Sequence, residues 1–182
     1  MKLRFFLDSE FNEHAKPFAL DPISISLVPE DRTAPDYYGV SRDFDASKIT
    51  PWLQDNVVKH LPAEQNRRSN AEIRDEMVEY LKDFSTKDNP VTSIEIWAYN
   101  GATDQVVMAN FFGGLTSLRA AFKAAGLPSP QFRELKDLTR ATGESLPPPA
   151  NAHDCHEDAL WARELFETLA PKLPPARKFL ME

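Results

Sequence analysis

The first forty residues alternate between apolar runs and short polar connections. Residues 3–8, LRFFLD, form a continuous apolar run typical of a buried strand, and residues 23–28, ISISLV, alternate between apolar and small polar positions. Residues 36–41, DYYGVS, predict a third strand. Because prolines interrupt residues 13–22 and residues 29–35 are polar, we predict connections at both places and an antiparallel three-stranded meander.

Helical spacing begins after Thr50. This residue is followed by proline, a combination typical of a helix start, and residues 52–61 then carry apolar side chains at helical intervals. The clearest predicted helix covers residues 69–84, where Ser69 is the expected N-cap and Glu72 occupies the capping-box position.

The second half of the chain alternates strands and helices. We predict an N-cap at Thr103, because an apolar helical stretch follows it and ends at a glycine pair. The other predicted elements are a strand at 93–98, a helix at 115–126, a short strand at 131–134, a loop at 139–150 and a final helix at 151–169. A meander followed by this alternation predicts an α/β fold with a mixed sheet.

Composition limits the classes of protein that fit this pattern. The 182 residues carry a net charge of −7 and one cysteine, which favours one domain in a reducing compartment such as the cytoplasm. No apolar run is long enough to cross a bilayer, so we expect no membrane partner. The negative charge disfavours a broad nucleic-acid-binding surface, and solvated faces are the preferred interpretation of the local basic groups. These groups are Arg67, Arg68 and Arg74; Arg133, Lys136 and Arg140; and Lys172, Arg177 and Lys178.

Four acidic residues lie where an uncompensated charge would be costly. Asp8 and Glu10 end the first predicted strand, two residues apart and hence on one side of it. Asp104 follows the fourth strand, and Asp158 lies in the last helix, five residues after His153. Divalent cations held by oxygen ligands commonly compensate such carboxylates. Four carboxylates and a histidine suit two-metal phosphodiester chemistry, with two Mg²⁺ or Mn²⁺ ions.

The same residues carry a family resemblance. DSE at 8–10, an aspartate after the fourth strand and H-x-C-x-x-D at 153–158 resemble the DEDDh 3′–5′ exonucleases. The segments between them resemble the small mycobacterial-type exoribonucleases, in the same order, across residues 2–169. The resemblance implies a ribonuclease-H-like five-stranded sheet of order 3-2-1-4-5, with the first and fourth strands parallel. It also implies one exonuclease domain at residues 1–170, an RNA 3′ end as substrate and nucleoside 5′-monophosphates as products. The residues after this domain, 171–182, form a Pro-rich basic tail.

Roles for the site residues follow from this resemblance. It implies that Asp8 bridges two ions and that His153 is the general base that deprotonates the attacking water. The five-residue spacing to Asp158 selects His153 over His156, and therefore the histidine subclass of the family. Cys155 stands where the family usually has alanine; we expect a small buried side chain there rather than a thiol nucleophile.

Substrate contacts are expected just after the DSE motif. Phe11 is either an aromatic wedge against the terminal base or a core residue, and the two interpretations have equal weight. The backbone of Phe11 and Asn12 is expected near the terminal sugar, where a contact to the 2′-hydroxyl would distinguish RNA from DNA. We expect all three tryptophans, Trp52, Trp97 and Trp161, in the core.

The leading hypothesis is a metal-dependent 3′–5′ exoribonuclease. A DNA-directed 3′–5′ exonuclease and a non-catalytic module that binds AMP or an RNA end are the alternatives. The resemblance also implies a homodimer, which would cover the tail residues Leu173, Phe179 and Leu180 and the apolar helix at 104–112. The other interpretation of that helix is burial inside its own domain.

Overall fold

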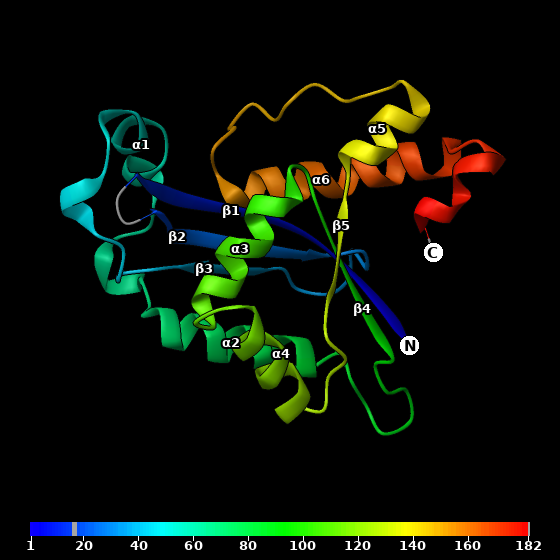
Figure 1. Ribbon diagram of the computed structural model, residues 1–182, viewed down its shortest axis with the longest axis horizontal. Coiled ribbons are helices and arrows are strands. Elements are labelled where there is room, and N and C mark those ends of the chain that lie inside the picture. The colour runs from blue at the N-terminus through cyan, green and yellow to red at the C-terminus, as the bar shows by residue number, and fades with distance from the viewer. Residues whose placement is uncertain (16–17, 182) are drawn as a thin grey trace.

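A five-stranded mixed sheet forms the centre of the protein (Figure 1). The computed structural model describes residues 1–15 and 18–181. The strands are β1 (Lys2–Ala15), β2 (Phe18–Pro29), β3 (Tyr37–Val40), β4 (Ser93–Ala98) and β5 (Gln131–Glu134). Their order is β3-β2-β1-β4-β5, with β1 parallel to β4 and antiparallel to β2. The predicted mixed sheet and strand order are therefore confirmed.

The hairpin of β1 and β2 is longer than predicted. The connection that we placed at 13–22 was wrong: its described residues belong to the two strands, and residues 16–17 lie outside the described part of the chain. Pro22 lies opposite Phe11 next to a register shift, and β3 pairs only with Ser24 to Leu27. Proline at a bulge beyond the end of the neighbouring strand removes no ladder hydrogen bond, which is why β2 continues through it.

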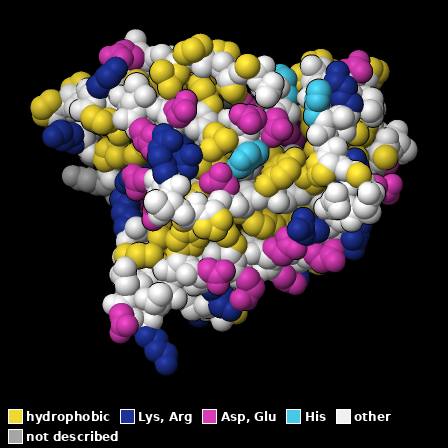
Figure 2. All heavy atoms as spheres, turned by 180° about the vertical axis from the view of Figure 1, so that it is seen from behind, with side chains coloured by type: hydrophobic (Ala, Val, Ile, Leu, Met, Phe, Trp, Pro, Cys, Tyr) yellow, Lys and Arg dark blue, Asp and Glu magenta, His cyan; other side chains and the backbone are white. Residues whose placement is uncertain are grey.

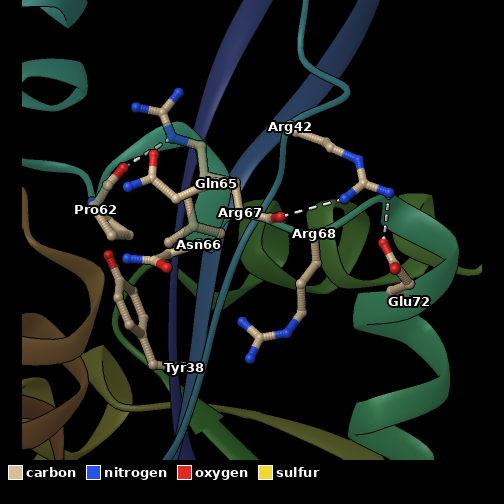
Figure 3. A pocket seen from close by; sticks show the side chains of 9 residues that line it. Tyr38, Arg42, Pro62, Gln65, Asn66, Arg67, Arg68 and Glu72 are labelled. Carbon is tan, nitrogen blue, oxygen red and sulfur yellow. Dashed lines mark hydrogen bonds and ion pairs between the residues drawn. The ribbon is translucent and has the colours of Figure 1, made fainter.

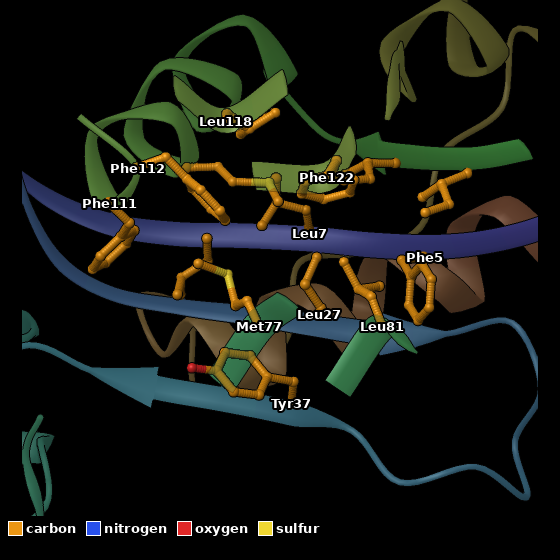
Figure 4. Close-up of a cluster of buried hydrophobic side chains, with 14 of the residues drawn as sticks. Phe5, Leu7, Leu27, Tyr37, Met77, Leu81, Phe111, Phe112, Leu118 and Phe122 are labelled. Atoms are coloured by element: carbon orange, nitrogen blue, oxygen red, sulfur yellow. The ribbon is translucent and has the colours of Figure 1, made fainter. Parts of the chain in front are cut away.

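Helices cover both faces of the sheet. The α-helices of the described chain are α1 (Pro51–Asn56), α2 (Asn70–Lys82), α3 (Gly101–Phe111), α4 (Leu115–Ala124), α5 (Lys136–Thr142) and α6 (Cys155–Leu169), and those from α2 onward lie on the two faces. On one face, Phe5 and Leu7 of β1 pack with side chains of α2, α3 and α4 (Figure 4). On the other face, Phe6 of β1 and Trp97 of β4 pack with α5, α6 and the residues that follow α6. Alternation along β1 therefore sends Asp8 and Glu10 toward α6.

The helix boundaries show where local signals suffice and where they fail. The Thr50 hydroxyl accepts the N–H of Leu53, and Ser69 with Glu72 forms the predicted capping box. Thr103 is not the N-cap of α3. The helix begins at Gly101, after a left-handed residue, because a carboxylate from β5 accepts the first N–H groups. Similarly, α5 extends into the predicted loop at 139–150, and α6 begins at Cys155, behind an aspartate N-cap, rather than at 151.

Several apolar residues that we assigned to a partner surface are buried within the chain. Leu173 is 4% exposed and Leu180 packs against the α6 cluster, while the side chain of Phe179 lies outside the described residues. Most apolar side chains of α3 are buried in their own domain, and Val106 is 42% exposed. These observations favour the single-domain interpretation of α3. Within the described residues, no helix is both long and apolar enough to span a bilayer.

Candidate active site

Three carboxylates converge where β1 meets the start of α6. Asp8 and Glu10 project from one side of β1, and Asp158 projects from the first turns of α6, which packs against β1 and β2. One oxygen from each carboxylate lies within 4.8 Å of the other two. The face seen in Figure 2 carries acidic side chains close to histidine side chains. The structure therefore brings Asp158 together with Asp8 and Glu10, from which it is more than a hundred residues away in sequence.

Asp104 approaches the same place from α3. It is 4% exposed, and its Oδ1 accepts a hydrogen bond of 2.6 Å from the Ser9 hydroxyl, on the strand between Asp8 and Glu10. Burial is the main cause that raises the pKa of Asp8, and the charge of Asp104 comes next, ahead of those of Asp158 and Glu10. Asp104 is therefore a close neighbour of Asp8, although it is not part of the group of three carboxylates.

The local electrostatics disfavour four simultaneous negative charges. Burial, followed by the charges of Asp158 and Asp104, raises the pKa of Glu10 to about 8. Burial also raises the pKa of Asp104 to about 7 against the hydrogen bond from Ser9, and it raises the pKa values of Asp8 and Asp158. Within the described chain, no Lys or Arg forms an ion pair with any of the four.

This donor set fits divalent cations. Clustered carboxylates with raised pKa values and no cationic side chain bind a hard cation through oxygen, which removes the mutual repulsion. Asp8, Glu10 and Asp158 are close enough together to hold one ion. The fourth carboxylate, Asp104, is not part of this group of three.

His153 lies at the rim of this cluster. Its backbone has a φ of 75°, and its N–H donates to Asp158 Oδ2 at 2.9 Å, which ties the loop before α6 to a carboxylate of the cluster. The imidazole is exposed and meets the indole of Trp52 edge-on, with ring centroids 4.8 Å apart and planes at 78°. An exposed imidazole next to a carboxylate of the cluster is a candidate general base.

The prediction that Trp52 lies in the core is wrong. It is 52% exposed on α1, whereas Trp97 is buried. The helix α1 lies beyond the sheet, beside the end of β1 (Figure 1), so only one side of it meets a core. The exposed side brings the indole to His153.

The neighbouring histidine and cysteine have structural contacts. Nδ1 of His156 lies 3.1 Å from the Ser26 hydroxyl, and Nε2 lies 3.6 Å from a carboxylate oxygen of Asp36. The thiol of Cys155 is buried, donates to Ser24 Oγ at 3.2 Å, and has a pKa raised by burial. These contacts support the preference for His153 over His156 as the base and leave Cys155 unsuited to be a nucleophile.

The residues after the DSE motif line the open end of the sheet. The pairing of β4 with β1 ends at Leu7, so β4 does not cover the edge of β1 from Asp8 onward. The Asn12 side chain is 1% exposed and donates to the Lys48 carbonyl at 3.0 Å, so it is committed to the fold. Phe11 is half-buried and packs against the α2–α4 core. A backbone contact from either residue to a substrate sugar stays a prediction.

Sequence reasoning missed two supporting residues. Ser9 holds Asp104, and its position inside the DSE motif was the available signal. Glu134 accepts the N–H groups of Asn100 and Gly101 at 3.1 and 3.0 Å, and thereby caps the helix that carries Asp104. No local pattern links Glu134 to α3, because the contact joins residues more than thirty positions apart.

The chain is similar in sequence to two curated proteins. No protein-family model matches the chain. Two curated proteins named 3′–5′ exoribonuclease, from Mycobacterium tuberculosis strains CDC 1551 and H37Rv, are each 36% identical over 162 residues, which is 86% of this chain and 87% of each relative.

Solved nuclease structures share the fold. Cell-death related nuclease 4 aligns with a TM-score of 0.56 and 10% identity, over 93% of this chain and 64% of its own. Escherichia coli exonuclease I, solved with a dA16 oligonucleotide, aligns with a TM-score of 0.55 and 14% identity, over 94% of this chain and 42% of its own. A zinc-bound form of exonuclease I with single-stranded DNA gives 0.53 and 12%, over 99% and 42%.

Proposed function

Because the chain belongs to the DEDDh family of 3′–5′ exoribonucleases, we propose that it hydrolyses the 3′-terminal phosphodiester of RNA with two divalent cations and releases nucleoside 5′-monophosphates. The observation that carries this proposal is the meeting of Asp8, Glu10 and Asp158 within 4.8 Å, with Asp104 as their neighbour. A set of charges this costly is expected where cations and a phosphate are bound.

The four carboxylates divide the work of holding the ions. Asp8, Glu10 and Asp158 would hold one Mg²⁺ or Mn²⁺, and Asp8 with Asp104 would hold the other. When bound, such ions lower the pKa of a water and stabilise the leaving 3′ oxygen. The Ser9 hydroxyl and the Glu134 cap keep Asp104 aimed at the cluster, so its carboxylate is oriented before the substrate arrives.

His153 is the group that accepts a proton in this proposal. Its exposed imidazole stands beside Asp158, and the backbone hydrogen bond to that carboxylate fixes the distance between the base and the ion site. A general base must lie within reach of the proton that it removes from the attacking water. The edge contact with Trp52 restricts the ring's orientation.

The choice of RNA rests on the more similar relatives. They are 36% identical and named exoribonucleases, whereas the exonuclease I solved with DNA is 14% identical and supports the fold alone. A DNA-directed exonuclease is the second candidate, because exonuclease I, which shares the fold, was solved in complex with a dA16 oligonucleotide. The intact set of four acids and His153 disfavours a non-catalytic binding module.

End-labelled single-stranded RNA, the same sequence as DNA, and a duplex with a 3′ RNA overhang test the proposal. Each substrate is incubated with Mg²⁺, with Mn²⁺, and with a chelator. We expect stepwise shortening of RNA from its 3′ end, 5′-monophosphate products and no turnover in chelator. Equal rates on RNA and DNA would favour the second candidate, and metal-independent cleavage would contradict the metal assignment.

The expected homodimer and cytoplasmic location belong to this proposal as well. A reduced, buried Cys155 is compatible with a reducing compartment. The structure describes one chain, in which much of the apolar surface first assigned to a partner is already covered. Light scattering at micromolar concentration distinguishes the mass of one chain from that of two.

A further inference from the structure

A cationic hollow lies beside the candidate active site. It has a volume of about 580 Å³ and is lined by Tyr38 of β3, by Arg42 just after β3 and by the segment that joins α1 to α2 (Figure 3). That segment contributes Gln65, Arg67 and Arg68. Its backbone is held to the end of β3 by hydrogen bonds from Arg68 N to Val40 O and from Arg42 N to Arg68 O, both 2.8 Å. We call this cavity the arginine hollow.

The arginine hollow and the acidic cluster open on the same face of the sheet. Along β3, Tyr37 faces the α2 core, so Tyr38 faces α6, and its ring lies 6.0 Å from that of His156. Burial is the main cause that raises the pKa of Tyr38; the charges of Asp154 and Glu10 add to it and Arg67 opposes it. Tyr38 therefore stands between the acids and the arginines.

The arginines are held in place with donors to spare. Arg42 pairs with Glu72 at 2.9 Å and Arg68 with Glu76 at 2.5 Å. Arg67 donates its Nε to the Pro62 carbonyl at 3.0 Å and has no carboxylate partner among the described residues. A guanidinium anchored through Nε keeps its two terminal nitrogens for another acceptor, and the planar group suits phosphate oxygens. The exposed amide of Gln65 adds a neutral donor at the rim.

We propose that the arginine hollow binds backbone phosphates of the RNA strand upstream of its 3′-terminal nucleotides. This proposal rests on the proposed function, because it takes the acidic cluster as the place where the 3′ end is held. A chain of net charge −7 repels a polyanion, so cations placed next to the acidic cluster give the strand a local attractive path. Arg67 is the principal ligand, and Arg42 and Arg68 exchange part of their carboxylate contacts for phosphate.

The test compares substrates that can and cannot reach the hollow. Steady-state hydrolysis of an RNA dinucleotide and of an eight-nucleotide RNA is measured for the wild type and for Arg67→Gln. For the longer RNA we expect KM to rise about tenfold, the loss of one charge-assisted contact, with kcat unchanged. The slope of log K against log salt should shrink by about 0.7. The dinucleotide kinetics should not change. Arg119→Gln, an exposed arginine on α4 over the opposite face, is the matched control.

A second variant separates phosphate binding from folding. Gln65 is exposed and has no hydrogen bond in the described chain, so Gln65→Glu adds a repelling charge without removing a contact. It should weaken binding of labelled eight-nucleotide RNA, measured by anisotropy in chelator, in the same direction as Arg67→Gln. Unchanged affinity and salt slope in both variants, or an equal loss on the dinucleotide, would overturn the proposal. If the wild type cleaved neither RNA, the proposed function would fail, while the anisotropy would still test the hollow by itself.

Discussion

Replacing one acid of the cluster should stabilise the metal-free protein. Glu10→Gln keeps the shape of the side chain and removes its charge. The pKa of Glu10 is raised from 4.5 to about 8, which corresponds to an upper limit of about 5 kcal/mol at about 1.36 kcal/mol per pH unit. Glu10 is half-buried, so solvent screening and local relaxation reduce the expected gain to about 1–3 kcal/mol.

The sign and the pH window of this effect follow from linkage. A carboxyl whose pKa is higher in the folded state binds its proton more tightly there, so it contributes stability at low pH and loses it as pH rises. For Glu10 this loss runs from its ordinary value of 4.5 to about 8. In chelator, the free energy of unfolding of Glu10→Gln should equal that of the wild type near pH 4.5. Above that pH the variant should become steadily more stable than the wild type, and the difference should stop growing above pH 8.

Thermal melts at intervals between pH 4.5 and 9, with chelator and with Mg²⁺, measure this effect. In a protein of this size each kcal/mol raises Tm by about 2–4 °C. Saturating Mg²⁺ should raise the Tm of the wild type more than that of the variant, because Glu10→Gln removes one carboxylate of the three-acid site and leaves Asp8 and Asp104 unchanged. Glu13→Gln, on an exposed position of the same strand, is the control. A variant that melts at or below the wild-type temperature at pH 9 in chelator would refute the electrostatic reasoning.

Three further predictions concern catalysis. Asp104→Asn should abolish turnover while the metal-free protein melts at the wild-type temperature or above; retained turnover in Mg²⁺ would end its assignment as an ion ligand. His153→Ala should lower kcat by about 10²–10⁴-fold with little change in metal affinity measured by calorimetry; a silent His153→Ala beside a damaging His156→Ala would show that the base is misassigned. Glu134→Ala should lower the free energy of unfolding by about 1–3 kcal/mol and also lower turnover, because it uncaps the helix that carries Asp104. An unchanged Tm together with unchanged turnover at saturating Mg²⁺ would contradict this.

Local patterns in the sequence determined most of the elements. The apolar run of β1, the capping box of Ser69 and Glu72, and the short strand β5 were all readable from neighbouring residues, because strand alternation and helix capping depend on positions a few residues apart. The candidate ligands were likewise visible as acids at strand ends and within a helix. The family resemblance implied the strand order, which the structure confirms, and three of the four acids meet in the structure.

Only the tertiary structure decided the features that depend on distant contacts. The start of α3 is set by Glu134 on β5, so Thr103 carried a misleading local signal. We interpreted Pro22 as a strand breaker. The strand β2 nevertheless continues through it, because β3 does not pair with β2 at that position. The exposure of Trp52 beside His153, and the gathering of Arg42, Arg67 and Arg68 around one hollow, depend on how the segments around α1 fold back over the end of the sheet. Such contacts join residues far apart in the chain, and no periodicity within a short window encodes them.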